Sequence, residues 1–371
     1  MGRQRLRIVT GMAACAAAGI GVLGAPSGAG AQPAATTPLH VIKTLSTSYI
    51  APLQFAVAGP FVVVADAGTG TLNVIGRDKP VFSGLGTQGS AAAFDPRTLN
   101  VGYSSTNDDH SATSFSIVSP LHKPVVADLA LFEKTHNPDG KVQYGVPHPS
   151  KCVSDALDKA GIPANYNGQV DSHPYAATAL GHGAWAVADA GGNDIVRVSR
   201  YGHPSTLAVL PRQALHVTSE FAAQNGLPKC TVGITYYFES VPTDVERGPS
   251  GWLYVSTLPG GEGVAGSVYR VNPHNGHATR IATGFAAATN IAVTPRGTVY
   301  VASLGDGTIR KVEHGRNAVV ANLPDVVAIE WANNHLYAST APVVEQEQDG
   351  PSGPSGPSGP PPHGRIVVLG R

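Results

Sequence analysis

Charged residues are scarce in this sequence: they make up 13% of its 371 residues, about half of the roughly 25% found in ordinary globular domains. Lys and Arg together number 25, and so do Asp and Glu. Residues 1–31 contain three arginines and no acid, so the rest of the chain has 22 basic and 25 acidic residues, a net charge of −3. Because nucleic acids and anionic membranes require a basic surface, this balance argues against both as partners.

After its first residues the sequence has no stretch of about 20 strongly apolar residues, the length needed to span a bilayer. The N-terminus has the pattern of an export signal instead. Arg3, Arg5 and Arg7 precede an uncharged segment at 8–23, and Ala29-Gly30-Ala31 is a small-x-small cleavage pattern. We therefore predict a secretory signal peptide at 1–31 and an extracellular mature chain. The alternative is a lipoprotein signal with Cys15 as the lipidated residue.

Cysteine is rare too, with three residues in all. Cys15 lies in the signal, which leaves Cys152 and Cys230. An even number of cysteines in an exported protein predicts a disulfide between them, and two buried free thiols are the alternative. The two lack CxxC spacing, which argues against a metal site.

Common catalytic motifs are missing: there is no Gly-x-Ser-x-Gly, His-Glu-x-x-His, EF-hand loop or P-loop. The segment 261–266 matches Gly-x-Gly-x-x-Gly. It lies between two expected strands of one hairpin, however, so no helix N-terminus is available to bind a pyrophosphate.

What the sequence does contain is an internal repeat. A β-branched run, a polar turn with Gly, and a second β-branched run recur at 61–75, 184–198, 252–271, 298–312 and 335–369, with a weaker copy at 98–118. Each copy has the pattern of a β-hairpin, and further strands before and after most copies give about four strands per unit. Such units bury both faces when they pack in a ring. We predict an all-β fold, a six-bladed β-propeller over 32–371; a β-sandwich is the alternative.

Three segments interrupt the repeat. The first insertion, 127–168, is predicted to contain a helix over 128–134 and another that begins after Ser150 and ends near Gly161. The second insertion is 212–240. The third segment, a Gly/Pro/Ser-rich loop at 345–363, is too short for a collagen triple helix and is predicted to be a long loop in the last blade.

Four motifs lie in or between these units: DLALFEKTHNPDG at 128–140, VDSHPYA at 170–176, VADAGGND at 187–194 and VPTDV at 241–245. In this order they resemble the ScyD/ScyE family of exported bacterial β-propellers, and more distantly the NHL-repeat propellers. The resemblance covers nearly the whole mature chain and implies an exported propeller. It implies little chemistry, because the activity of the family is not well established.

Propeller topology brings residues at the start of each innermost strand to one mouth of a central channel. We expect carboxylate, amide and imidazole groups to gather there and to bind a ligand or a hard cation such as Ca²⁺. The candidates are Asp171, His173, Asn290, Asp325 and Glu330. The turn residues Asp66 and Asp189 are expected to accept backbone N–H bonds within their own turns instead.

Since no nucleophile–base pair can be named, we expect a non-catalytic binding or scaffold protein, monomeric, whose channel mouth takes a small molecule, a carbohydrate or a protein. The alternative is an extracellular hydrolase or lactonase that depends on a divalent cation. That alternative requires the side chains of Asp171, Asn290, Asp325 and Glu330 to converge.

Overall fold

Hairpins with tight polar turns are the units of this fold, as the repeat predicts. The computed structural model describes residues 38–86, 88–107, 111–260, 264–313, 315–341 and 363–371. In one turn the Oδ1 of Asp66 accepts the N–H groups of Ala51 (2.8 Å) and Gly68 (3.2 Å). Asp189 repeats this arrangement with His173 and Gly191. The predicted role of both aspartates is confirmed, and each also holds the segment that leads into its own sheet.

Five sheets are each built from four strands that are consecutive in the chain and antiparallel to their neighbours. The first two are β2 (Pro52–Ala58), β3 (Phe61–Asp66), β4 (Thr71–Val74) and β5 (Phe82–Ser83), and then β6 (Gln88–Asp95), β7 (Asn100–Thr106), β8 (Thr113–Val118) and β9 (Val125–Asp128). The third is β12 (Pro174–Gly181), β13 (Ala184–Asp189), β14 (Asp194–Val198) and β15 (Pro204–Val209). The fourth is β18 (Pro242–Arg247), β19 (Leu253–Thr257), β20 (Gly266–Val271) and β21 (Ala278–Phe285). The fifth is β22 (Ala288–Val293), β23 (Val299–Ser303), β24 (Thr308–Glu313) and β25 (Arg316–Asn322), with the 3₁₀ turn η2 (Leu304–Asp306) between its middle strands.

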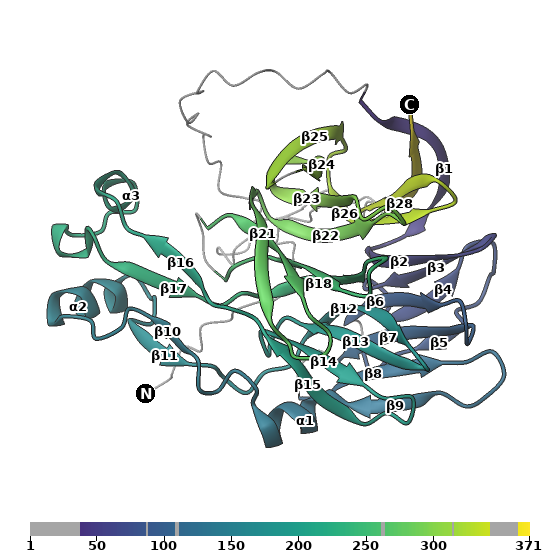
Figure 1. Ribbon diagram of the computed structural model, residues 1–371, viewed down its shortest axis with the longest axis horizontal. Helices are drawn as coiled ribbons and strands as arrows, with labels where there is room; N and C mark the ends of the chain where they lie inside the picture. Colours follow the sequence, from purple (N-terminus) through teal and green to yellow (C-terminus); the bar gives the residue numbers. More distant parts are fainter. Residues whose placement is uncertain (1–37, 87, 108–110, 261–263, 314, 342–362) are drawn as a thin grey trace, which may run out of the picture.

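The sixth sheet joins the two ends of the chain. Its strands are β26 (Val326–Ala332), β27 (His335–Thr340), β28 (Gly364–Gly370) and, on the outside, β1 (His40–Tyr49). β1 runs antiparallel to β28, from the pair His40–Gly370 to the pair Tyr49–Gly364, and Figure 1 shows the two side by side near the C-terminus. The last sheet is therefore completed by the beginning of the described chain.

These six sheets form a closed ring. The first strand of each contacts the first strand of the next, in the order β2, β6, β12, β18, β22, β26 and back to β2. Apolar clusters fill the space between neighbours: Trp185 of β13 is fully buried and packs against Phe115 of β8, with ring centroids 5.8 Å apart. The fold is a β-propeller, as predicted, and its sheets are its blades. None of the helices in the described part of the chain has the length and hydropathy required to cross a bilayer.

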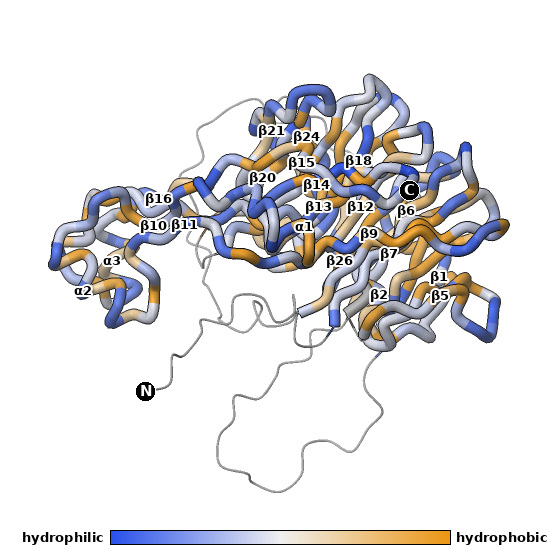
Figure 2. Tube along the Cα trace, turned by 90° about the horizontal axis from the view of Figure 1, so that it is seen from below, coloured by the Kyte–Doolittle hydropathy of each residue, from blue (hydrophilic) through white to orange (hydrophobic). Residues whose placement is uncertain are grey.

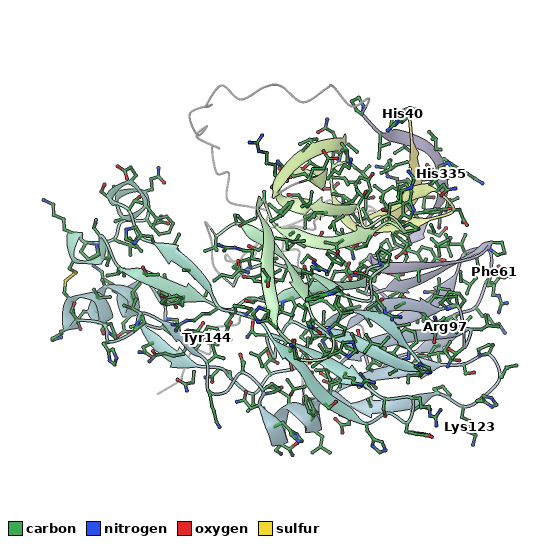
Figure 3. All side chains as sticks on the ribbon, viewed as in Figure 1. His40, Phe61, Arg97, Lys123, Tyr144 and His335 are labelled. Carbon is green, nitrogen blue, oxygen red and sulfur yellow. A yellow bond between two sulfur atoms is a disulfide. The ribbon has the colours of Figure 1, made fainter. Side chains whose placement is uncertain are left out.

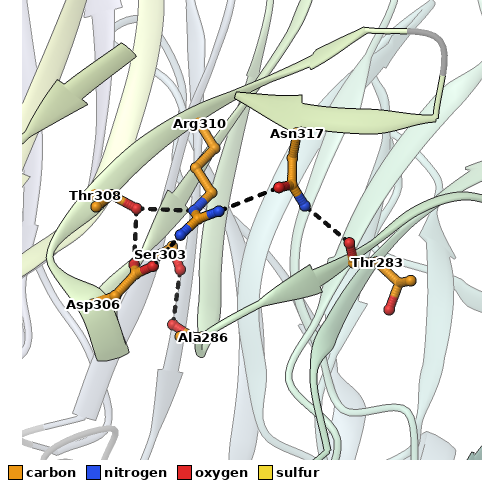
Figure 4. A network of polar contacts seen from close by, with 7 residues as sticks. All are labelled: Thr283, Ala286, Ser303, Asp306, Thr308, Arg310 and Asn317. Atoms are coloured by element: carbon orange, nitrogen blue, oxygen red, sulfur yellow. Dashed lines mark hydrogen bonds and ion pairs between the residues drawn. The ribbon is translucent and has the colours of Figure 1, made fainter. Parts of the chain in front are cut away.

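Polar contacts also join neighbouring blades at the outside of the ring (Figure 4). Asn317 of β25 donates from its Nδ2 to the carbonyl of Thr283 of β21 (2.9 Å) and accepts from Arg310 of β24 (3.2 Å). Arg310 also pairs with Asp306 of η2. The fourth and fifth blades are thus fixed to each other at their outer strands.

A seventh four-stranded sheet, the insertion sheet, is built from the two segments that interrupt the repeat. Its order is β11 (Asn165–Asn167), β10 (Gln143–Gly145), β17 (Thr235–Phe238) and β16 (Gln213–His216), and α2 (Lys151–Lys159), α3 (Ser219–Gln224) and the 3₁₀ turn η1 (Lys229–Thr231) accompany it. Figures 1 and 2 show this sheet extending away from the ring. The helix α1 (Leu129–His136) stays on the ring and contacts β8 and β15.

Both predicted helices of the first insertion are present. The Asp128 side chain caps α1 by accepting from the N–H of Leu131 (2.8 Å). Ser150 caps α2 through the N–H of Val153 (3.3 Å), and Gly161, just after the C-cap, has a φ of +72°. A residue with a Cβ is strained in that conformation, which explains why glycine ends this helix.

The predicted disulfide between Cys152 and Cys230 is also present, with a Cα–Cα distance of 6.4 Å. It joins α2 of the first insertion to η1 of the second, and Figure 3 shows it at the tip of the insertion sheet, far from the ring. Since it closes a loop of 78 residues, it should restrict the unfolded state strongly.

We expect the double substitution Cys152→Ser/Cys230→Ser to destabilise the insertion sheet by about 2–4 kcal/mol and to leave the ring folded. Hydrogen exchange monitored by mass spectrometry should show faster exchange at residues 143–167 and 213–238, while peptides from β13 and β19 keep their protection. Equal acceleration in both regions would contradict this separation of the two bodies.

Three sequence predictions lie outside the described residues. They are the signal peptide at 1–31 with its alternative lipidation site Cys15, the Gly/Pro/Ser-rich loop apart from His363, and the first glycines of the 261–266 motif.

Candidate functional site

The centre of the ring contains a cavity of about 290 Å³. At roughly 30 Å³ per water molecule, it has room for a ligand the size of about ten waters. Small or apolar residues of β2, β6 and β12 form one side, and the other side is polar. The polar lining residues are Gln54, Thr178, Asp244, Glu246, Asn290 and Glu330.

Two of these residues hold neighbouring blades together. Each first strand has an irregular register near its start, and Asp244 and Asn290 occupy the same position after it in β18 and β22. The Oδ2 of Asp244 accepts the N–H of Ile291 in the next blade (2.8 Å), and the Oδ1 of Asn290 accepts the N–H of Ile329 (2.7 Å). The Nδ2 of Asn290 donates to the Oε1 of Gln54, which lies in β2 and also lines the cavity (2.9 Å). Asp244 and Asn290 therefore stabilise the ring while they line the cavity.

Glu246 and Glu330 lie two residues further along their strands. Glu246 of β18 pairs with Tyr254, and Glu330 of β26 pairs with Tyr337, so both carboxylates occupy the same level of their blades. The matching residue of the blade between them is Ala292. Because side chains two residues apart point to the same face of a strand, both glutamates enter the cavity on the side of Asp244.

Burial raises the pKa of all three carboxylates of the cavity, and neighbouring acidic charges add to the shift for Glu246 and Glu330. Burial, and then the Asp244 charge, raise the pKa of Glu330 to about 8. Burial raises the pKa of Asp244 to about 7, although the N–H groups of Ile291 and Val245 oppose the shift. Burial, Glu330 and Asp244 raise the pKa of Glu246 well above its ordinary value. In the described part of the chain no Lys or Arg forms an ion pair with any of them.

The five candidates from the sequence are divided among several places. Asn290 and Glu330 line the cavity. His173 is buried at the start of β12, where its ring stacks on Tyr175 at 4.8 Å between centroids. Asp171 donates its N–H to Glu133, and Asp325 is exposed in the turn before β26, with a φ of +61° and its carbonyl bonded to Ala341.

Four polar residues of the cavity were not among the five sequence candidates: Gln54, Thr178, Asp244 and Glu246. The signal for Glu246 was nonetheless present, since the first strands of three blades align as TDVE, TNIA and VAIE at 243–246, 289–292 and 327–330. Gln54 has no such signal, because its role depends on Asn290, which is 236 residues away.

A second group of acidic side chains lies where the insertions meet the ring, near Tyr144 in Figure 3. We call it the junction cluster; it consists of Glu133, Asp139, Asp171, Asp189, Asp194 and Glu239. All of the cluster except Glu239 comes from three of the motifs at 128–140, 170–176 and 187–194. The fourth motif reaches it through Val241, whose N–H donates to Asn193 Oδ1 (3.0 Å). Four segments that are separate in sequence thus meet at this point.

Only some of the carboxylate oxygens of the junction cluster accept hydrogen bonds. The Oδ2 of Asp139 accepts from the Tyr144 hydroxyl (2.9 Å) and from the Asn193 amide (3.0 Å). The pKa of Glu133 is raised to about 8. Burial is the largest cause, and the charges of Asp189, Asp139 and Asp171 add to it. Burial, with the charges of Asp189, Glu133 and Asp139, raises the pKa of Asp194 well above its ordinary value.

A second cavity, of about 440 Å³, lies at the outside of the ring between the second and third blades. Its basic residues His122, Lys123, His182 and Arg200 are all exposed. Exposed side chains do not fix a ligand in one orientation, so the central cavity is the better candidate site.

Neither a protein-family model nor a curated protein matches this chain. Among solved structures, a virginiamycin B lyase from Staphylococcus aureus is 14% identical, over 81% of this chain and 80% of its own, with a TM-score of 0.47. The PQQ-bound aldose sugar dehydrogenase of Streptomyces coelicolor is 13% identical, over 89% and 97%, with a TM-score of 0.46. A Bacteroides thetaiotaomicron protein of unknown function is 10% identical, over 90% and 76%, with a TM-score of 0.50. At such identities a likeness extends to the fold and not to the chemistry.

Proposed function

We propose that this protein is an exported β-propeller of ScyD/ScyE type that binds a small, positively charged ligand in its central cavity, without catalysing a reaction. The observation that carries the proposal is the cavity lining: Asp244, Glu246 and Glu330 share one cavity with no basic partner among the described residues. Burial of unpaired carboxylates is costly. A ligand that brings positive charge offsets this cost, whereas a neutral or anionic ligand does not.

Export is supported by the signal pattern at 1–31 and by the disulfide, which is stable in an oxidising compartment. The proposed protein acts as a monomer and presents the cavity to small molecules. Asp244 and Asn290 already bond to neighbouring blades. Glu246 and Glu330 are therefore the groups that would contact the ligand.

The test is calorimetric titration with 1,4-diaminobutane as the cationic probe and 1,4-butanediol as its neutral counterpart. We expect the diamine to bind and the diol not to bind. As the pH drops from 8.5 to 6, the affinity for the diamine should fall about tenfold per pH unit for each proton that the carboxylates take up. The sign follows from the raised pKa values of Glu330 (about 8) and Asp244 (about 7): protons compete with the diamine for the same oxygens as the pH falls through these values.

Glu246→Gln/Glu330→Gln should lose at least tenfold in affinity. Glu220→Gln, which changes an exposed glutamate of α3, should bind as the wild type does. Equal binding of the diol and the diamine, or unchanged affinity in the double variant, would overturn the proposal.

A divalent-cation-dependent hydrolase is the second candidate, but it could not use the expected set of residues, because Asp171 and Asp325 do not converge with Asn290 and Glu330 on the cavity. The observation that favours it is Glu330, which with a pKa of about 8 is protonated at neutral pH and has the state required of a general acid. Turnover of a lactone such as γ-butyrolactone that needs Ca²⁺ and is lost in Glu330→Gln would favour this function over simple binding.

A further inference from the structure

We propose that Glu133 and Asp194 form a binding site for one divalent cation of the calcium class, with Asp139 beside it as a further source of negative charge. The site belongs to the junction cluster and is separate from the central cavity. It would fix the first insertion to the third blade. The observations are the burial of these side chains, their unpaired oxygens and the space between them.

Unpaired oxygens are the first observation. Asp194 is fully buried and neither of its carboxylate oxygens has a hydrogen-bond partner. Glu133 is 2% exposed and its Oε1 is unpaired, as are the Oδ1 of Asp139 and the Oδ1 of Asn137. A buried acceptor without a donor costs about 1–3 kcal/mol, and more when it is charged. Five such oxygens at one junction, without donors among the described residues, are compensated either by protons, as the raised pKa values of Glu133 and Asp194 indicate, or by a bound cation.

The second observation is the space between the two carboxylates. Glu133 reaches it from α1 and Asp194 from the start of β14. A Cβ on Gly192 would lie 3.2 Å from Asp194 Oδ1 and 3.3 Å from Glu133 Oε2. The backbone of Gly192 is not in the left-handed region, so its conformation does not require glycine. The missing side chain therefore leaves a cradle that opens onto both carboxylates.

The chemistry of the donors selects the ion. All of the unpaired atoms are carboxylate or amide oxygens, which are the ligands that Ca²⁺ prefers, and Ca²⁺ tolerates irregular sets of six to eight oxygens completed by carbonyls and water. Among the described residues no three His, Cys, Asp or Glu side chains already surround one point as metal ligands. The site is therefore a two-carboxylate site, which argues against Zn²⁺ with its closed tetrahedral sets.

Such an ion would connect parts of the chain that are otherwise joined by few bonds. Asp139 already links the first insertion to the third blade through Asn193, which in turn links to Val241 after the second insertion. A cation between α1 and β14 would add a bond of the same kind next to this one. The expected consequence is a more stable junction, not a change in the central cavity.

The experiment compares the full-length exported protein in Ca²⁺ and in EDTA by differential scanning calorimetry and by calorimetric titration with CaCl₂. The wild type should bind one Ca²⁺ and melt about 5 °C higher at saturating Ca²⁺ than in EDTA. Asp194→Asn should lose both effects, and in EDTA it should melt close to the wild type, because the raised pKa of Asp194 already favours its uncharged form there. Asp158→Asn, which changes an exposed acid of α2, should behave as the wild type.

Gly192→Ala is the second variant, since it fills the cradle and keeps every carboxylate; it should weaken Ca²⁺ binding at least tenfold. Glu246→Gln/Glu330→Gln should keep the Ca²⁺ effect, which separates this site from the proposed function. If the wild type does not bind Ca²⁺, the proposal is overturned, and protons shared among the carboxylates of the junction cluster would be the explanation of their burial. Ca²⁺ binding that is lost only in Glu246→Gln/Glu330→Gln would overturn the proposal as well.

Discussion

A chain that starts at Ile50, and so lacks β1, should melt at least 10 °C below a chain that starts at Pro38. β1 supplies the outer strand of the last blade and pairs with β28 from His40 to Tyr49 at six registered positions. At a net value of about 1 kcal/mol per hydrogen bond, the loss is comparable with the whole stability of a typical domain, about 5–15 kcal/mol. It also leaves β28 as an exposed edge strand, which favours aggregation.

The cause of this large effect is topological. The other five blades are continuous in the chain, while β1 is the one strand that joins the beginning of the described chain to its end. Calorimetry of both chains gives the difference directly. A synthetic peptide of residues 38–49 added in trans should restore part of the melting temperature. Melting within 2 °C of the control chain would show that β1 is not needed for closure.

The hairpins of the blades could be predicted from the sequence, whereas the place of β1 could not. Hairpins with a turn such as Ala65–Asp66–Ala67–Gly68 are visible because strand, turn and strand are adjacent and because Asp66 bonds within its own turn. Residues 40–49 alternate only weakly and are mostly exposed, so no pattern in them identifies β28 as their partner. The hairpins and their packing in a ring were predictable, but the pairing of β1 with β28 in the last blade was not.

Part of the candidate site was also predictable from the sequence, and part was not. Asn290 and Glu330 were predicted because every first strand lines the channel, and both line the cavity. Of the junction cluster only Asp171 was a candidate, because Glu133 and Asp194 are 61 positions apart in the chain and meet only when α1 packs on the third blade. In the sequence Glu133 is one acid on a short helix, and nothing distinguishes a buried face from an exposed one there. Its burial becomes known only from the packing.

Trp185→Ala should lower the free energy of unfolding by about 3–5 kcal/mol, the usual cost of removing a buried large aromatic side chain. Trp185 is fully buried between the second and third blades, where it contacts Phe115. The space around it cannot close, because Gly102 is already so near that a Cβ there would lie 3.0 Å from the indole and 2.6 Å from Phe115. The β-strands on both sides are fixed in their sheets, so the substitution leaves a cavity.

Trp252→Ala is the matched control, because it removes the same side chain from a half-buried position where the guanidinium of Arg270 lies 4.1 Å above the ring. It should cost about 1 kcal/mol, the usual range of such a cation–π contact. Urea unfolding followed by circular dichroism measures both variants without relying on tryptophan fluorescence. Equal costs for the two substitutions would mean that the interface between the second and third blades contributes no more than the surface does. That result would contradict a ring held together by apolar contacts between its blades.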